Sequence, residues 1–365
     1  MTVNGYFDAN ATTALDPPAR EAWLSASWYN PSSLYANAAK ARLELEQCRE
    51  RLGDLLQCEP EDLIFLSGAT EANNAVAAWF QSRGQRMAIS AIEHPSLSEP
   101  AAAAEHIPVE PDGRVSPASI EQMLQQPSRP GLVSLMAANN ETGVLQPWQE
   151  ALALCRSAGV LFHCDAAQWL GKHPAAGLGD CDFVTGSAHK FGGPKGTGFL
   201  KVSGGFRWLR GGPQEGRRRA GTENLPGIAA MLAALEAAGE RLSSQQHLHE
   251  ARDAFESAIL ARIPGTMIVG ATAARLWNTS LLILPAHPNV KWVARLSCLG
   301  FAVSTGSACS SGGGASEVLR AMALPEDSLR HVIRVSSTWE HTRTDWLALA
   351  DAMVRVFADL ETGTA

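Results

Sequence analysis

The most informative turn of the chain reads Ser187-Ala-His-Lys-Phe-Gly-Gly-Pro-Lys-Gly-Thr-Gly198, directly after the apolar run 181–186. That run predicts a strand, and the turn holds too much glycine for the interior of a helix or a strand. Lys190 is therefore expected at a strand end, where it loses water contacts and its proton and acts as an amine nucleophile. Such an amine forms a Schiff base with a carbonyl cofactor. On these residues alone, an ordinary loop lysine beside a tight turn stays open.

The composition predicts a protein with a sizeable apolar core. The chain has 365 residues, of which 45% are hydrophobic, so we expect one large and one smaller domain. Its net charge of −7 argues against nucleic-acid binding and a membrane-surface role. No signal peptide or membrane-spanning run is evident, and seven cysteines without a Cys-x-x-Cys pair predict neither disulfides nor a metal site. The expected location is the cytoplasm.

Short apolar runs alternate with helical stretches along most of the chain. Runs that are apolar throughout and are separated by helices predict a mostly parallel sheet with helices on both faces. The predicted strands are 63–66, 87–90, 132–137, 160–164, 183–185 and 198–202, and the predicted helices between and before them are 38–57, 70–82, 116–126 and 147–158.

The domain boundary is expected near residue 240. We predict a large α/β domain over 12–240 and a smaller α+β domain over 241–365, which also takes in residues 1–11. A long helix over about 223–262 would bridge them, and strands near 266–269, 278–284 and 301–304 would belong to the smaller domain.

Polar motifs follow three of the predicted strands. Ser67-Gly-Ala-Thr-Glu71 opens a helix, and its small residues and free N–H groups favour an anion such as phosphate. His94 and Asn139 follow two other strands, at the edge where open α/β sheets bind ligands. The alternatives are a helix cap at Thr70, a hydrogen-bonded loop histidine and Asn-Asn turn chemistry.

Asp165 ends a strongly apolar strand in His163-Cys-Asp-Ala-Ala-Gln168. A buried carboxylate there needs a cationic or hydrogen-bonding partner. A protonated pyridine nitrogen is such a partner, and Gln168 is near enough in sequence to reach the same ligand. A simple N-cap is the alternative for Asp165.

These motifs occur in one order, and with them the sequence resembles a known family. The whole chain is similar to the fold-type I pyridoxal-phosphate enzymes of the class V aminotransferase group, and more narrowly to the NifS/IscS-like cysteine desulfurases. Further segments that carry the resemblance are Tyr6-Phe-Asp-Ala-Asn-Ala-Thr-Thr13, Asn30-Pro-Ser-Ser33, Arg219-Ala-Gly-Thr-Glu-Asn224, Ser304-Thr-Gly-Ser-Ala-Cys309 and Ile333-Arg-Val-Ser336.

The resemblance implies the cofactor pyridoxal 5′-phosphate and a role for each matching residue. Lys190 would hold the cofactor covalently, Asp165 would pair with the pyridine nitrogen, and His94 would stack on the ring and move protons. The residues that would face the phosphate are Ala69, Thr70, Ser187 and His189, and Thr222 would complete the phosphate site of a neighbouring subunit in a homodimer. Asn139 and Gln168 would lie beside the ring oxygen. Arg334 would bind the substrate carboxylate, and Asn139 would also contact the substrate.

Cys309 distinguishes the subfamilies. It lies among small residues rather than apolar ones, which is typical of a reactive rather than a packed cysteine. In the desulfurases this cysteine, in a mobile loop of the smaller domain, takes the sulfur of L-cysteine as a persulfide. The products would be L-alanine and sulfur for an acceptor or scaffold protein, with iron–sulfur cluster assembly among the destinations.

The rival interpretations are a class V aminotransferase, a selenocysteine lyase and a non-catalytic sulfur-assembly partner on the same scaffold. Departures from the family pattern lie at Pro213, 285–295, 311–316 and 337–342. They concern the rate, the acceptor protein and substrate access more than cofactor binding.

Overall fold

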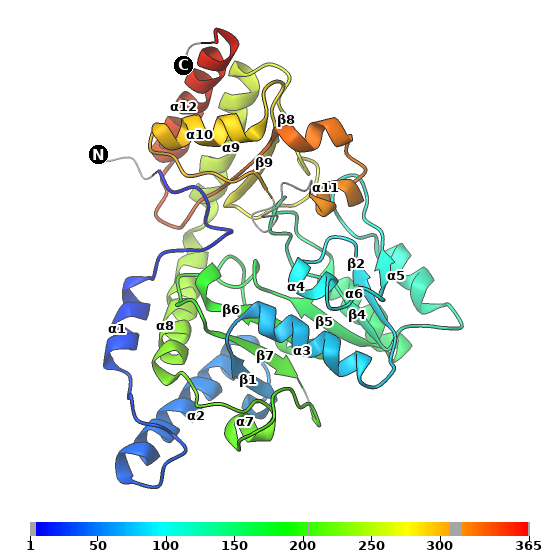
Figure 1. The fold of residues 1–365 in the computed structure, drawn as a ribbon, viewed down its shortest axis with the longest axis vertical. Helices are drawn as coiled ribbons and strands as arrows, with labels where there is room; N and C mark the ends of the chain where they lie inside the picture. The colour runs from blue at the N-terminus through cyan, green and yellow to red at the C-terminus, as the bar shows by residue number, and fades with distance from the viewer. Residues whose placement is uncertain (1–4, 203, 307–315, 364–365) are drawn as a thin grey trace.

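The computed structural model describes residues 5–202, 204–306 and 316–363. A seven-stranded sheet with its helices fills one part of the molecule, and a smaller three-stranded sheet with three long helices fills the other (Figure 1). The strands are β1 (Leu63–Leu66), β2 (Met87–Ser90), β3 (Glu105–Ile107), β4 (Leu132–Ser134), β5 (Leu161–Asp165), β6 (Phe183–Ser187), β7 (Gly198–Val202), β8 (Met267–Ile268), β9 (Thr279–Ile283) and β10 (Val332–Ser336). The helices are α1 (Pro17–Ser25), α2 (Ala36–Leu56), α3 (Ala69–Gln81), α4 (Pro95–Ser98), α5 (Pro117–Leu124), α6 (Trp148–Ala158), α7 (Gln214–Arg217), α8 (Leu225–Arg241), α9 (Gln246–Arg262), α10 (Asn289–Cys298), α11 (Glu317–Ala321) and α12 (Arg343–Glu361).

The large sheet has the strand order β1-β7-β6-β5-β4-β2-β3. The pairs from β6 to β3 are parallel, whereas β7 runs antiparallel to both of its neighbours. The prediction of a mostly parallel sheet is thus confirmed. Because β2, β4, β5 and β6 run in the same direction, their carboxyl ends meet at one edge, where the predicted site residues follow them.

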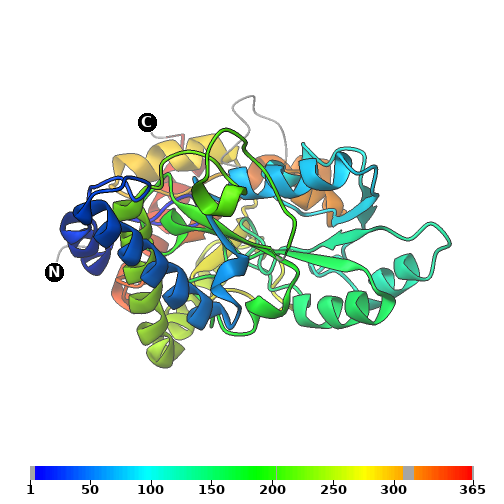
Figure 2. The ribbon, with the colours of Figure 1, turned by 90° about the horizontal axis from the view of Figure 1, so that it is seen from below.

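Helices cover both faces of this sheet, as predicted (Figure 2). Phe65, Val184 and Phe199 point to the face covered by α2, α6 and α8. Their sequence neighbours Ile64, Phe183 and Leu200 point to the face covered by α3. Since successive strand residues alternate between faces, both sets must be apolar, which explains why the strands read as continuous apolar runs.

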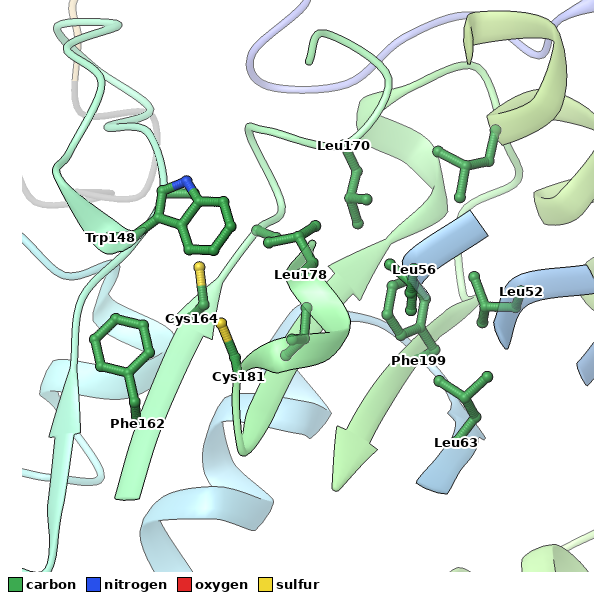
Figure 3. Packing of buried hydrophobic residues seen from close by; sticks show 14 of the residues in the cluster. Leu52, Leu56, Leu63, Trp148, Phe162, Cys164, Leu170, Leu178, Cys181 and Phe199 are labelled. Carbon is green, nitrogen blue, oxygen red and sulfur yellow. The ribbon is translucent and has the colours of Figure 1, made fainter. Parts of the chain in front are cut away.

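Cys164 and Cys181 lie side by side in the first of these cores, near Trp148 and Phe162 (Figure 3). Burial raises the pKa of the Cys164 thiol well above its ordinary value, and the neighbouring Cys181 adds to that shift. A thiol that stays protonated is a poor nucleophile. Cys164 therefore acts as a packing residue, and Cys181, which is also fully buried, packs beside it.

The smaller sheet, in the order β10-β9-β8, is antiparallel and has its own apolar cluster with α9, α10 and α12. Phe7, from the start of the chain, belongs to this cluster, where its ring contacts Trp346. We therefore propose the domain division 12–240 and 241–365 with 1–11, supported by the separate membership of the two clusters.

Two sequence predictions for the smaller unit are wrong. The expected single helix over 223–262 is two helices, because α8 ends at Arg241 and a short 3-10 turn precedes Gln246. Serine has low helix propensity at this break, and α8 packs on α1 and α2 whereas α9 packs on α12. The expected strand at 301–304 is reduced to isolated bridges at Ala302 and Ser304.

Within the described ranges, no helix is both long and apolar enough to cross a membrane.

Candidate active site

Lys190 ends a single 3-10 turn (Ala188–Lys190) that follows β6 directly. Its Nζ donates hydrogen bonds to the carbonyl oxygens of Asn10, at 2.6 Å, and Ala11, at 3.0 Å. The turn is tight, since a Cβ on Gly193 would lie 2.7 Å from the Cβ of Ala188. The sequence prediction of a lysine at a strand end is confirmed, and neutral carbonyl groups rather than carboxylates hold its amine in these bonds.

Asp165 is the last residue of β5 and is 5% exposed. Its Oδ1 accepts a hydrogen bond from the backbone N–H of Ala167 at 2.9 Å, and its Oδ2 accepts one from Asn73 Nδ2 at 2.8 Å. Two N–H donors on a buried carboxylate stabilise its negative charge. The two hydrogen bonds fix the Asp165 carboxyl group at the carboxyl edge of the sheet.

His94 caps the N-terminus of the short helix α4. Its Nδ1 accepts the backbone N–H of Ser96 at 3.1 Å and lies 2.9 Å from Ser96 Oγ. Burial lowers the pKa of the His94 imidazole, while the charge of Asp165 raises it and that of Lys190 lowers it further. The structure therefore brings together three residues that the sequence separates by almost a hundred positions.

The N-terminus of α3 lies close to the end of β6 and the start of β7, since a Cβ on Gly198 would lie 2.6 Å from the Cα of Gly68. Gly68 has φ 145°, and a Cβ there would lie 3.3 Å from Ser187 Oγ. The first N–H groups of the helix, at Ala69 and Thr70, have no acceptor within the helix. The backbone N–H of Ser67 donates to Glu71 Oε2 at 2.7 Å, which holds the Glu71 carboxylate beside the start of the helix.

His189 lies in the 3-10 turn that follows β6, and its Nδ1 is 3.2 Å from Thr12 Oγ1. Burial, followed by the charges of Lys190, Lys195 and Lys172, lowers its pKa to about 4. His189 is therefore a neutral hydrogen-bonding group at pH 7 and adds no charge to the site.

Gln168 binds the segment that crosses the site. Its Nε2 donates to Asn10 O at 3.0 Å, and its Oε1 accepts from Lys172 Nζ at 2.6 Å. Burial lowers the pKa of Lys172 to about 7, and the charges of Lys190 and Arg334 act in the same direction. Gln168 and Lys190 thus share one carbonyl acceptor, that of Asn10.

Arg334, on β10, is 2% exposed. Its Nη2 forms an ion pair with Asp8 Oδ1 at 2.7 Å, and its Nη1 donates to the carbonyls of Asn140 and Gly306. Its buried Nε has no hydrogen-bond partner among the described residues. The guanidinium thus reaches the site from the smaller unit and keeps one donor available.

Asn139 holds its own turn. Its Oδ1 accepts from the backbone N–H groups of Glu141 and Thr142, both at 2.9 Å, and its Nδ2 donates to Ile92 O. The turn chemistry weighed in the sequence is therefore present. The role of Asn139 beside a cofactor or substrate stays a prediction.

Two further predicted residues are Thr222 and Cys309. Thr222 is exposed on the loop before α8, and Cys309 lies outside the described residues. On the near side of that stretch Gly306 O accepts from Arg334, and on the far side Ser316 Oγ donates to Glu141 Oε2 at 2.6 Å.

Four buried polar residues at the site were missed in the sequence, namely Asn73, Glu93, Ser96 and Lys172. Asn73 follows Thr70 by three positions, and this spacing places both on one helix face. That periodicity was the available signal for Asn73. Ser96 and Glu93 flank His94 within two residues, and nothing in the local pattern marks them as buried.

The sequence matches the aminotransferase class-V family over residues 5–349. It is 39% identical to a cysteine desulfurase of Klebsiella pneumoniae over 352 residues, covering 91% of this chain and 87% of that protein. It is 33% identical to the cysteine desulfurase IscS of Dictyoglomus turgidum over 378 residues, covering 98% and 95%. A NifS-like protein from Rickettsia africae has the same fold, with a TM-score of 0.88, 29% identity and coverage of 98% and 100%.

Enzymes of this family use pyridoxal 5′-phosphate, and the relatives share nearly the full length of the chain. The family match, the identity and the position of the site at the carboxyl edge of the sheet agree. The chain therefore belongs to the class V aminotransferase family, and within it to the NifS/IscS-like cysteine desulfurases.

Proposed function

We propose that the chain binds pyridoxal 5′-phosphate at the carboxyl edge of the large sheet and releases L-alanine from L-cysteine, with the sulfur passing to Cys309. The observation that carries this proposal is that Asp165, Lys190 and His94 lie at the carboxyl ends of the parallel strands β5, β6 and β2, at one edge of the sheet. An anion, an amine and an aromatic ring in one place are the groups that a pyridinium aldehyde needs.

The residues present fit this cofactor. The start of α3, with Gly68 close to Ser187 Oγ, offers N–H groups of Ala69 and Thr70 and a hydroxyl to a phosphate. Asp165 offers a buried anion to a protonated ring nitrogen. Thr70, Ser187, His189 and, from a neighbouring subunit, Thr222 would hold the phosphate, while Asn139 and Gln168 would lie beside the ring oxygen.

When bound, pyridoxal phosphate supplies an electron sink for the electrons released at the substrate α-carbon. Lys190 would hold the cofactor and then carry the α-proton at Nζ. Arg334 would bind the substrate carboxylate through its guanidinium. The substrate carboxylate would then replace part of the ion pair between Arg334 and Asp8. The thiolate of Cys309 would attack the substrate sulfur, so that a sulfur–sulfur bond forms as the carbon–sulfur bond breaks.

We further propose that the enzyme works as a homodimer. Large apolar side chains are exposed around α1 and α2: Leu24 (75%), Trp28 (78%), Leu34 (99%), Tyr35 (50%) and Leu43 (61%). Exposed apolar patches of this kind mark protein interfaces. A groove lined by Pro31, Arg42, Gln214 and Glu223 lies in the same region, and Glu223 Oε2 is buried without a partner among the described residues.

Glu223 adjoins Thr222, so a second subunit seated in this groove would meet the loop that is expected to reach the neighbouring phosphate site. We propose that the persulfide is delivered in the reducing cytoplasm to an acceptor or scaffold protein, including one that assembles iron–sulfur clusters. The relatives do not favour an aminotransferase, a selenocysteine lyase or a non-catalytic partner.

One assay tests the reaction. Wild type, Cys309→Ala and Lys190→Ala are incubated with L-cysteine and a thiol reductant, and alanine and enzyme-bound sulfane sulfur are measured. We expect the Cys309 variant to keep the cofactor absorbance and lose alanine formation by on the order of a hundredfold or more. The Lys190 variant should lose the absorbance of covalently held cofactor. Persulfide on a Cys309→Ala enzyme at the wild-type rate would rule out the role of Cys309.

A further inference from the structure

Asn73 connects the two groups that are expected to contact the cofactor. It lies on α3 with no exposed surface, and its Nδ2 donates to Asp165 Oδ2 and to Ser96 Oγ, both at 2.8 Å. A carboxylate only accepts hydrogen bonds, so the amide nitrogen rather than the oxygen must face Asp165. Both hydrogens of the amide nitrogen are then in use.

The hydroxyl of Ser96 carries the connection to His94. Because Ser96 Oγ accepts a hydrogen bond from Asn73, its own hydrogen is directed to another acceptor, and His94 Nδ1 lies 2.9 Å away. The backbone N–H of Ser96, which can only donate, points to the same Nδ1 at 3.1 Å. Two donors on Nδ1 require a nitrogen without a proton, so the ring hydrogen of neutral His94 is on Nε2.

We propose that Asn73 is a positioning residue that holds Asp165 in place and, through Ser96, keeps His94 in the form protonated on Nε2. This inference deepens the proposed function, since it rests on Asp165 and His94 as cofactor contacts. Its consequence is that His94 offers the site a hydrogen-bond donor at Nε2. Nδ1 is occupied by two hydrogen-bond donors and does not transfer protons. The proton-moving role that the sequence predicted for His94 is therefore limited to Nε2.

The direction of the electrostatic effects agrees with this geometry. Burial is the main cause that lowers the pKa of His94. The charged groups that act on the ring are Asp165 and Glu99, which favour its protonation, and Lys190, which opposes it. Asn73 satisfies Asp165 directly and presents no charge to the imidazole.

The first test reads the tautomer without the cofactor. Protein with nitrogen-15-labelled histidine is stripped of cofactor, and two-bond proton–nitrogen correlations are recorded; the signals of His94 among the ten histidines are assigned with His94→Gln. We expect an acceptor-type Nδ1 and a protonated Nε2 in the wild type. In both Ser96→Ala and Asn73→Ala, the nitrogen-15 chemical shift of His94 Nδ1 should move toward that of a mixture of the two tautomers. Ser96→Ala removes the hydroxyl donor and keeps the backbone N–H donor.

Asn74→Ala is the matched control. Asn74 is the next residue of the same helix, and its Nδ2 donates to the backbone carbonyls of Thr70 and Ser96 rather than to the Ser96 hydroxyl. We expect its His94 signals to match the wild type. Unchanged Nδ1 signals in both Ser96→Ala and Asn73→Ala would overturn the proposal, and so would a protonated Nδ1 in the wild type.

A second measurement distinguishes the effect of Asn73 on Asp165 from its effect on His94 through Ser96. Binding of pyridoxal 5′-phosphate is titrated by absorbance in all variants, and we expect about tenfold weaker binding in Asn73→Ala because Asp165 loses a donor. Ser96→Ala should bind nearly as well as wild type, since it leaves the bond between Asn73 and Asp165 in place. Equal affinity in all three proteins would contradict the hold on Asp165. If the wild type failed to bind the cofactor, the proposed function would fail while the tautomer test still decided the role of Asn73.

Discussion

Glu93 is a carboxyl group buried just beyond β2, beside the candidate site. Its Oε1 accepts from Ser90 Oγ at 2.6 Å and from the backbone N–H of Met136 at 2.8 Å, and its buried Oε2 has no partner among the described residues. Burial, with a contribution from the charge of Asp165, raises its pKa to about 8. At neutral pH Glu93 therefore keeps its proton, so that Asp165 has no second anion beside it.

Replacing Glu93 with Gln should change how stability depends on pH. Between the ordinary pKa of 4.5 and about 8, the folded protein holds a proton that the unfolded chain lacks. The wild type therefore loses up to about 1.4 kcal/mol of unfolding free energy per pH unit as the pH rises through this range. Glu93→Gln lacks this loss, so its stability relative to wild type should improve from pH 5 to pH 8 in urea unfolding. Exposed Glu99→Gln is the control, and a constant Glu93→Gln difference across the range would refute the raised pKa.

Lys172 should change the unfolding free energy with pH in the opposite direction to Glu93. Its folded pKa of about 7 lies below the ordinary 10.5, so between these values the unfolded chain holds a proton that the folded protein lacks. This group should raise the stability of the wild type as the pH increases from 7 to 10, by at most about 1.4 kcal/mol per unit. Lys172→Met should show a smaller rise, whereas Lys40→Met on the exposed face of α2 should follow the wild type. Parallel curves for Lys172→Met and wild type would show that Lys172 is charged when folded.

The site residues differ in how far sequence could predict them. Lys190, Asp165 and His94 each follow an apolar strand, and strand ends at one sheet edge are a local signal. Asn73 sits in a helix whose polar residues look like a solvated face, and its burial depends on β5 and α4. The spacing from Thr70 places Asn73 on one helix face with it, but the burial of Asn73 depends on partners 23 and 92 residues away, which no local pattern reveals.

At the scale of elements, the loop around α7 is anchored to the edge of the large sheet by one carboxylate. Glu215 accepts two hydrogen bonds from Arg49, at 2.8 and 3.0 Å, and one from the backbone N–H of Phe65. Its side chain is 1% exposed, and its φ of 49° is unusual for a residue with a side chain. Pro213, where the sequence departs from the family pattern, therefore lies in a loop that Glu215 anchors to the sheet two residues later.

Breaking this ion pair should be costly. Glu215→Ala leaves the Arg49 guanidinium buried without its main partner, so we expect a loss of about 3–5 kcal/mol in unfolding free energy. Glu46→Ala is the control, because Glu46 is half exposed and pairs with the same arginine at 3.1 Å, for an expected loss below about 1 kcal/mol. Urea unfolding measures both, and equal losses would show that Glu215 does not anchor the loop.

The elements of the large sheet were more predictable than those of the smaller one. Strands β1, β2 and β7 match their predicted bounds because each is a continuous apolar run between turn residues. Strand β10 and the bridge from Tyr6 to Ala302 escaped detection since their pairing joins residues far apart in sequence. The break between α8 and α9 depends on which core each helix packs against.

At the scale of the whole molecule, the exposed apolar patch predicts the assembly state. The wild type should have the mass of two chains in light scattering. Leu34→Glu combined with Trp28→Glu should produce monomers and weaken cofactor binding at least about tenfold, since Thr222 would no longer reach its neighbour. Leu260→Glu, at an exposed leucine of α9, should remain dimeric with unchanged affinity. A monomeric wild type that binds the cofactor fully would refute the shared site.

The segment that crosses the site ties the first residues of the chain to its last strand. The backbone of Phe7 donates to Ala302 and that of Ala9 to Ser336, while the Asn10 carbonyl accepts from Lys190. During synthesis this segment leaves the ribosome long before its partners near Ser336. All strands of the large sheet precede β10 in the chain, so a nascent chain can form that sheet before the segment has its partners, and the site is completed only once the smaller unit has folded.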